Sequence, residues 1–354
     1  MRNKNLFQAA CPQIKTMKMK SSILLLVLLF TLAMGCKKNK DAAPPKDPDV
    51  YVAGSEYNGS KNVAIVWKNG IAQSLTDGSK TAYANAVYVS GSDVYVAGYE
   101  NNAANKSIAI VWKNGTPQSL TNGSANGIAR SVYVSGSDVY VAGYENNAAN
   151  KSIATVWKNS TAQPLTDGSK DAYASSVCVS GSNVYVAGYE YNGARYIVKV
   201  WKNGVAQPLT DGSKNANANA VCVAGSDVYV AGYEASGSPY AAKVWKNGIV
   251  QTLSDGSSDA YAYSVYVTGS DVYVAGYEGK TIATVWKNGI AQRLTNGSNK
   301  TAAYSVYVAG GDVYVAGYQY NAANKTIATV WKNGTAQTLT DGSKDGSAVA
   351  VFVK

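Results

Sequence analysis

The chain has 354 residues, with 34 Gly, 27 Tyr, 7 Trp and no His, and charged residues make up 15% of it. This composition favours a globular, turn-rich β protein over a helical or a disordered chain. Without an imidazole there is no Ser–His or Cys–His nucleophile pair, no His-ligated zinc and no ordinary proton shuttle near neutral pH.

The formal charge of +10 is unevenly distributed along the chain. Nine basic residues and only two acidic residues precede Asp49, so residues 49–354 carry 23 basic against 20 acidic side chains. A part with so small an excess has no strong basic field, and we therefore expect no nucleic-acid partner.

The segment 17–36, MKMKSSILLLVLLFTLAMGC, begins with lysines and continues with an apolar run from Ile23 to Met34. The run has 12 residues, which is too short for a permanent bilayer span and predicts a secretory signal. Because Gly35 precedes Cys36, the segment resembles bacterial lipoprotein signals, although Ala33 stands where that family usually has Leu. The resemblance implies that residues 1–35 are a signal peptide and that Cys36 is lipidated.

A polar, Pro-containing segment, residues 36–48, follows and is typical of a tether. We expect an exported protein that is lipid-anchored at the cell envelope, at the outer membrane or the cell surface. Cleavage by an ordinary signal peptidase, which would leave Cys36 as a plain thiol, stays open as an alternative.

Seven repeats follow Asp49, each marked by one tryptophan at intervals of 41 to 45 residues. Regular repeats of this length are typical of arrays and rings of small β-sheets. One large aromatic residue per repeat is expected to pack between neighbouring repeats. The seven tryptophans are Trp67, Trp112, Trp157, Trp201, Trp245, Trp286 and Trp331.

Each repeat contains four short runs with strand character. "SVYVSG" and "DVYVAGY" alternate β-branched and aromatic residues and are joined by Ser-Gly-Ser-Asp, whereas "IATVWK" is followed by Asn-Gly and a fourth run. Asn-Gly between two such runs predicts a type I′ hairpin, since both residues tolerate positive φ. Four antiparallel strands per repeat describe one blade of a β-propeller.

The two ends of the repeat region complement each other. The first repeat lacks an "SVYV" strand, and residues 348–354 supply one that has no partner. The sequence thus predicts an all-β, seven-bladed propeller over residues 49–354, closed by the C-terminal strand joining the first blade. The repeat resembles bacterial β-propeller repeat families of secreted and surface proteins, which implies a fold and no particular activity. We expect a monomer.

The connections divide between two faces of such a ring. The tight Ser-Gly-Ser-Asp and Lys-Asn-Gly turns share one face, which we call the turn face, and the longer connections share the other, the loop face. All length variation lies after "GYE" on the loop face, where 10 to 14 residues separate its glycine from the tryptophan. An acidic face rich in Asn and Tyr argues against polyphosphate and favours a carbohydrate or protein ligand.

All six glutamates of the chain end the same strand, in the motif "YE" or its variant. In one interpretation they pair with lysines of the loops; in the other, the "YE" pairs contact a ligand around the loop face. The candidate ligand-binding residues are Tyr99, Glu100, Tyr144, Glu145, Tyr189, Glu190, Tyr233, Glu234, Tyr277 and Glu278.

Two adjacent blades depart from the repeat. Cys178 and Cys222 replace the Tyr of "SVYV", and Lys199 and Lys243 replace Thr or Ile before the tryptophan. A reactive thiol and amine are one interpretation. The other is that a long Lys stem fills the space left by a small Cys. A disulfide between the two cysteines is not expected, because equivalent positions on neighbouring blades rarely lie close enough.

These patterns predict a non-catalytic binding module at the cell envelope, with no cofactor and no metal. A glycan-processing enzyme, either a glycosidase or a lyase with paired carboxylates, is one alternative. A purely structural envelope protein is another.

Overall fold

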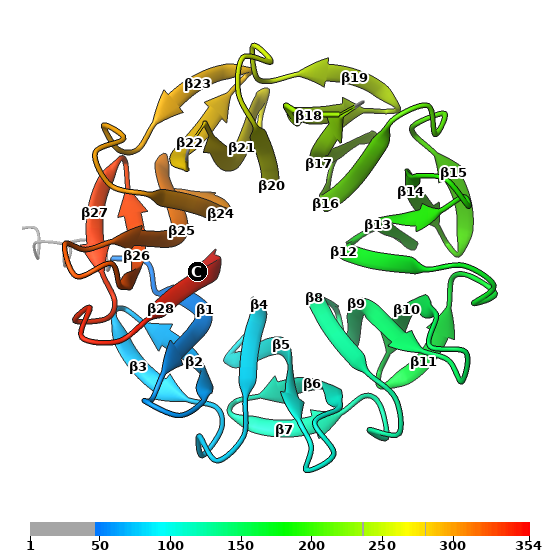
Figure 1. The fold of residues 1–354 in the computed structure, drawn as a ribbon, viewed down its shortest axis with the longest axis horizontal. Helices are drawn as coiled ribbons and strands as arrows, with labels where there is room; N and C mark the ends of the chain where they lie inside the picture. The colour runs from blue at the N-terminus through cyan, green and yellow to red at the C-terminus, as the bar shows by residue number, and fades with distance from the viewer. Residues whose placement is uncertain (1–46, 236, 280) are drawn as a thin grey trace, which may run out of the picture. The chain divides into compact units, whose positions relative to one another are not determined.

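The computed structural model describes residues 47–235, 237–279 and 281–354, so the predicted signal peptide and most of the tether lie outside the described residues. The described part forms seven four-stranded antiparallel sheets arranged as a ring (Figure 1). The predicted all-β, seven-bladed propeller is confirmed. The blades are numbered in chain order.

The strand bounds are as follows. Blade one contains β28 (Gly346–Val353), β1 (Val50–Tyr57), β2 (Asn62–Lys68) and β3 (Ile71–Ser74). Blade two contains β4 (Ala82–Ser90), β5 (Asp93–Asn101), β6 (Ser107–Lys113) and β7 (Thr116–Ser119). Blade three contains β8 (Gly127–Ser135), β9 (Asp138–Asn146), β10 (Ser152–Lys158) and β11 (Thr161–Pro164). Blade four contains β12 (Ala172–Ser180), β13 (Asn183–Tyr191), β14 (Tyr196–Lys202) and β15 (Val205–Pro208). Blade five contains β16 (Asn215–Ala224), β17 (Asp227–Ala235), β18 (Ala241–Lys246) and β19 (Ile249–Thr252). Blade six contains β20 (Ala260–Thr268), β21 (Asp271–Glu278), β22 (Ile282–Lys287) and β23 (Ile290–Arg293). Blade seven contains β24 (Thr301–Ala309), β25 (Asp312–Tyr320), β26 (Thr326–Lys332) and β27 (Thr335–Thr338).

The ring is closed by its last strand, as the sequence predicts. β28 pairs antiparallel with β1, with Val50 opposite Val353 and Val52 opposite Val351. Backbone hydrogen bonds of 2.8 and 2.9 Å also join Asp49 and Lys354. The first blade is therefore completed by residues from the far end of the chain, which removes an open sheet edge.

A β-bulge in the innermost strand shapes every blade. In blade three the register of β8 against β9 shifts between Ala129 and Ser131, so that Arg130 is the extra residue. Opposite this bulge lies Gly143, and a Cβ atom there would overlap the carbonyl oxygen of Ile128. Corresponding glycines in the other six blades face the same overlap. The glycine of "VAGY" is thus required by the bulge.

The hydrophobic core consists of seven clusters, each containing side chains from two neighbouring blades. Trp157 of blade three packs against Ala97 and Val111 of blade two. The seven tryptophans are between 0% and 2% exposed. The prediction that they pack between blades is confirmed, and large buried aromatics account for much of the hydrophobic stabilisation.

The turn face is held together by one repeated polar arrangement. In blade three, Lys158 Nζ lies 2.8 Å from Asp138 Oδ2, and Asn159 Nδ2 donates a hydrogen bond to Asp138 Oδ1 at 2.8 Å. Hydrogen bonds from Lys158 and then Asn159 lower the pKa of Asp138. Asn159 also accepts a hydrogen bond from the backbone N–H of Val139 at 2.9 Å. In blade four Asn183 replaces the aspartate, and its side-chain oxygen still accepts a hydrogen bond from the side-chain amide of the turn asparagine, Asn203.

The close approach of the bulge to the glycine generates a testable prediction. Gly143→Ala should lower the free energy of unfolding by about 2–3 kcal/mol, because the new methyl group overlaps a backbone carbonyl that cannot rotate away. Gly237→Ala is the matched control, since Gly237 has no atom within 4 Å of the added Cβ and should change stability little. Chemical denaturation of both variants measures the difference, and equal midpoints would show that the bulge does not require glycine.

Candidate functional site

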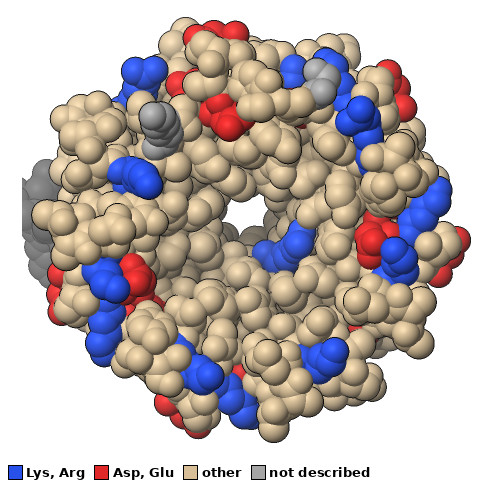
Figure 2. All heavy atoms as spheres, viewed as in Figure 1, with Lys and Arg blue, Asp and Glu red and all other residues tan. Residues whose placement is uncertain are grey.

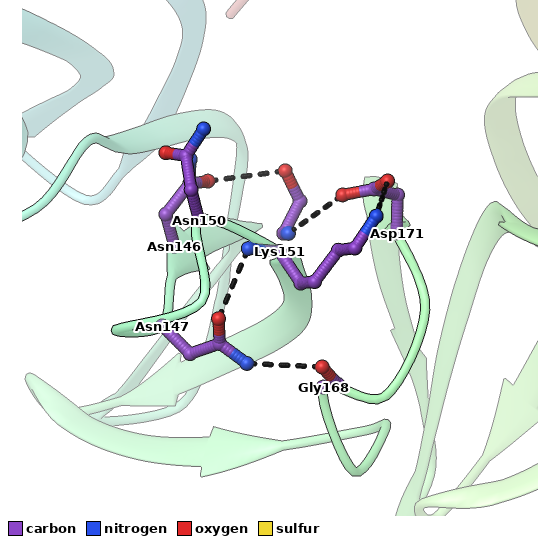
Figure 3. Close-up of polar contacts among 7 residues, drawn as sticks. Asn146, Asn147, Asn150, Lys151, Gly168 and Asp171 are labelled. Carbon is purple, nitrogen blue, oxygen red and sulfur yellow. Dashed lines mark hydrogen bonds and ion pairs between the residues drawn. The ribbon is translucent and has the colours of Figure 1, made fainter.

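The longer connections of the loop face are held by their own asparagines, as blade three shows (Figure 3). Asn147 accepts a hydrogen bond from the backbone N–H of Lys151 at 3.0 Å and donates one to the carbonyl oxygen of Gly168 at 2.9 Å. Asn146 donates a hydrogen bond to Asn150 at 3.0 Å. Amides that the sequence offers as sugar-binding groups are therefore already engaged within the loop.

An aspartate from the neighbouring connection holds this loop in place. Asp171 lies just before β12, and its carboxylate accepts hydrogen bonds from Lys151 Nζ at 3.2 Å and from the backbone N–H of Ser152 at 3.0 Å (Figure 3). Asp345 forms the same pair of contacts with Lys325 and Thr326 at the end of blade seven. Much of the polarity of the loop face thus serves the loops themselves.

The tyrosine and the glutamate of each "YE" pair point to opposite sides of their sheet, because successive strand residues alternate. Glu145 lies on the side of Trp157, which faces blade two. Tyr144 lies on the other side, where its ring contacts that of Tyr173 from blade four at 4.9 Å between centroids. The two residues of one pair therefore line different inter-blade gaps. The same alternation applies to Tyr99 and Glu100, Tyr189 and Glu190, Tyr233 and Glu234, and Tyr277 and Glu278.

Four of the glutamates lie beside a basic side chain. The separations between the charged atoms are 3.5 Å for Glu100 and Lys80, 2.5 Å for Glu190 and Lys199, 3.7 Å and 3.8 Å for Glu234 with Lys214 and Lys243, and 4.0 Å for Glu278 and Arg293. These contacts favour the pairing interpretation. Ligand contact by the "YE" residues stays a prediction.

Burial acts on the two remaining glutamates. It raises the pKa of Glu145, and burial followed by the nearby Asp341 raises the pKa of Glu56. Both carboxylates are thus less readily ionised than an exposed glutamate. Glu56 also borders a crevice of about 200 Å³ together with Lys344 of blade seven.

The lysines of blades four and five do not fill space left by the cysteines, contrary to that interpretation of the sequence. Cys178 lies opposite Tyr185, whereas Lys199 lies opposite Gly188, three residues farther along the same strand. Lys199 extends to Glu190 instead. Cys178 and Cys222 are both free thiols in the structure.

An arc of aromatic rings lines the channel near the turn face. It is formed by the residues at the Tyr position of "SVYV" on the innermost strands, and the centroids of its neighbouring rings lie 4.6 to 4.9 Å apart. Cys178 and Cys222 occupy this position in blades four and five and interrupt the arc. The five aromatic residues are Tyr133, Tyr88, Phe352, Tyr307 and Tyr266.

Arg130 lies farther from the turn face, at the bulge of β8. Its guanidinium carbon lies 5.1 Å from the ring centroids of both Tyr144 and Tyr173, and its Nη1 donates a hydrogen bond to the Tyr189 hydroxyl at 3.2 Å. These distances are typical of cation–π contacts. Three tyrosines from two blades therefore hold one partly buried cation.

The central opening is electrostatically asymmetric. Figure 2 shows Lys or Arg atoms at the edge of the opening, whereas the Asp and Glu atoms of this view lie farther out. Arg130 is the one charged residue in the seven innermost strands β4, β8, β12, β16, β20, β24 and β28. We take the channel around Arg130 as the candidate functional site.

Arg130 was not among the candidates that sequence reasoning selected. The signal was present, because the other six repeats have Asn, Ser, Tyr or Val where blade three has Arg in "ARSVYV". A single departure in polarity on an inner strand points to the channel more directly than residues repeated in every blade.

Two crevices lie between neighbouring blades, away from the channel. A crevice of about 470 Å³ lies between blades four and five and is lined by Lys202, Gln207 and Trp245, among others. A similar crevice of about 220 Å³ lies between blades two and three, so this is a repeated feature of the inter-blade gaps.

Across the described part of the chain, no group of three His, Cys, Asp or Glu side chains could hold a metal ion. That part also contains no helix with the length and hydrophobicity needed to cross a membrane.

Solved structures with the same fold provide the only comparison that gives matches. One is a puromycin-hydrolysing peptidase of Mycobacterium tuberculosis, with a TM-score of 0.55 and 12% identity, covering 83% of this chain and 53% of that one. Another is a puromycin hydrolase, with a TM-score of 0.58 and 10% identity, covering 84% of this chain and 54% of that one. No family model matches the chain, and no curated protein does.

These relatives correct two expectations drawn from the sequence. The prediction of a non-catalytic binding module and the prediction that the chain is not an enzyme are contradicted, because the two proteins described above that share its fold are a puromycin-hydrolysing peptidase and a puromycin hydrolase. This chain spans about half the length of the solved structures it matches. At such low identity the likeness demonstrates the fold, and activity enters only as a proposal.

The thiols beside the aromatic arc generate a prediction. Burial raises the pKa of the Cys178 thiol to about 12 and also raises that of Cys222, so both should remain protonated and unreactive in the folded protein at about pH 8. Iodoacetamide should label neither residue before unfolding and both afterwards, as measured by peptide mass spectrometry. Rapid labelling of the folded chain would show that a thiol is ionised and accessible, and no labelling after unfolding would reveal a disulfide.

Proposed function

We propose that this propeller takes part in the hydrolysis of a peptide or amide bond, as the propeller component of a peptidase. The fold shared with a puromycin-hydrolysing peptidase and a puromycin hydrolase is the observation that carries the proposal. The chain corresponds to about half of each relative. We therefore assign the hydrolytic groups to a part of the peptidase outside these 354 residues.

The composition of the chain supports this division of roles. With no His among 354 residues, a Ser–His or Cys–His pair cannot be built from the ring's own side chains. The ring contributes a channel in which Arg130 and three tyrosines present a cation and aromatic surfaces. Such a combination suits the placement of an amino-acid-like substrate before its bond is cleaved.

The proposal predicts that peptide hydrolysis depends on the chain. Cells that make it should hydrolyse puromycin, or aminoacyl and peptidyl coumarin amides, faster than otherwise identical cells from which the gene has been deleted. For the preferred substrate we expect a difference of at least about tenfold, because only background enzymes remain after deletion. The rate of product release by washed cells is the measurement.

Two controls complete this experiment. Re-expression of the full chain should restore the rate, and immunoblotting should confirm that the chain is present. Equal rates in both strains over the whole substrate panel would refute a role in peptide hydrolysis. Hydrolysis by the purified 354-residue chain would support the activity and would overturn the assignment of the hydrolytic groups to a part outside it.

Export and anchoring through a lipid on Cys36 remain proposals, together with the expectation of a monomer. The support for export and anchoring is the signal-like segment 17–36 and the polar tether that follows it. An envelope location would place the ring among peptides outside the cytoplasm.

The anchor can be tested by metabolic labelling with an alkyne fatty acid. The full chain should carry the label and sediment with membranes, whereas Cys36→Ser should lose the label and become soluble, because a lipid chain contributes most of its membrane affinity. Cys178→Ser should keep both properties. An unlabelled protein whose N-terminal Cys36 has the mass of a plain cysteine would support simple secretion instead.

A further inference from the structure

We infer that Arg130 is the anchor of a carboxylate-binding site in the central channel. Its ligands are short peptides or acylated amino acids that have a free carboxylate and an aromatic side chain. This deepens the proposed function and rests on it for the peptide nature of the ligand. The carboxylate preference itself rests on the geometry of the channel.

The first support is the fixed position of the guanidinium group. Tyr144 and Tyr173 lie against it at 5.1 Å, and the Tyr189 hydroxyl accepts one hydrogen bond from Nη1 at 3.2 Å. An arginine has five N–H donors in a planar fork, and the hydrogen bond to Tyr189 uses one of them. The remaining donors leave Arg130 able to bind a planar anion with two parallel hydrogen bonds.

The second support is the absence of a counter-ion. None of the ion pairs among the described residues includes Arg130, although twelve lysines and Arg293 form such pairs. Its neighbours are neutral phenols, and burial raises the pKa of Tyr144, which keeps that phenol protonated. A partly buried cation without an anion is unfavourable, so an incoming anion would gain from it.

The charge of the channel distinguishes a carboxylate from a phosphate. Arg130 is the one charged side chain on the innermost strands, so the site offers a single positive charge. A carboxylate carries one negative charge and matches the fork of one arginine. A phosphate group carries nearly two charges and is usually bound by several cations or by backbone amides.

The far side of the channel supplies the aromatic preference. Tyr263 and Tyr304 occupy the bulge position of β20 and β24, which is the position of Arg130 in β8. Their ring centroids lie 5.2 Å apart. Strands β20 and β24 lie across the opening from β8 (Figure 1). A ligand held at Arg130 would therefore extend an apolar group toward aromatic rings.

Calorimetric titration of the full chain in detergent micelles tests the inference with three ligands. N-acetylphenylalanine should bind, and its amide should bind at least about tenfold more weakly, because it lacks the charge that Arg130 recognises. Phenyl phosphate should bind more weakly than N-acetylphenylalanine. These comparisons use one unaltered protein and so do not depend on the folding of any variant.

Variants then identify the residue. Arg130→Gln should weaken N-acetylphenylalanine binding by at least about tenfold and leave binding of the amide unchanged, whereas Arg130→Lys should retain part of the affinity. Arg293→Gln is the matched control, since the Arg293 side chain is 63% exposed on the outermost strand β23 and should not affect binding. Circular dichroism confirms that each variant is folded.

Each outcome decides one point. Equal binding of the acid and the amide, no binding of the acid at about 10 mM, or tighter binding of phenyl phosphate would overturn the carboxylate site. Full acid affinity in Arg130→Gln would overturn the role of that residue. If the chain binds the carboxylate but its deletion leaves peptide hydrolysis unchanged, only the proposed function is refuted. If deletion slows peptide hydrolysis but the chain does not bind the carboxylate, only this inference is refuted.

Discussion

The fold depends on a contact between a backbone carbonyl and a glycine in every blade. Because Gly143 has no side chain, β8 can bulge toward β9 and place one extra residue at the channel. Along the rest of the strand, side chains alternate between the two faces of the sheet, and the bulge interrupts this alternation at the extra residue. The scaffold can therefore stay constant in seven copies while the channel differs from blade to blade. Arg130 is the extra residue of the bulge in blade three.

Repetition explains both what the sequence reveals about the fold and what it conceals about the site. The tryptophan spacing, the Asn-Gly turns and the strand without a partner at residues 348–354 specify the number of blades and the closure, since each rests on local chemistry. Position within the bulge is different. It follows from a register shift between Ala129 and Ser131, and the glycine that permits the shift lies on the partner strand rather than beside the bulged residue in the sequence.

The glutamates illustrate the same limit. Their recurrence in "YE" predicts a ring of similar sites, but strand alternation separates each glutamate from its tyrosine. The lysine partners of Glu190 and Glu234 come from positions that sequence reasoning had connected with the cysteines instead. Residues that are adjacent in sequence were thus grouped too readily, and residues on facing strands were not grouped at all. Cross-strand register is the information that was missing.

The closure of the ring has a consequence for biosynthesis. Blade one lacks its innermost strand until residues 346–353 have left the ribosome, so β1 presents an unpaired edge while the other six blades are being made. An edge of this kind can pair with another unfinished chain. Pairing between such distant parts of the sequence is also slow compared with local hairpin formation. Residues 346–353 therefore complete the first blade and protect its edge from aggregation.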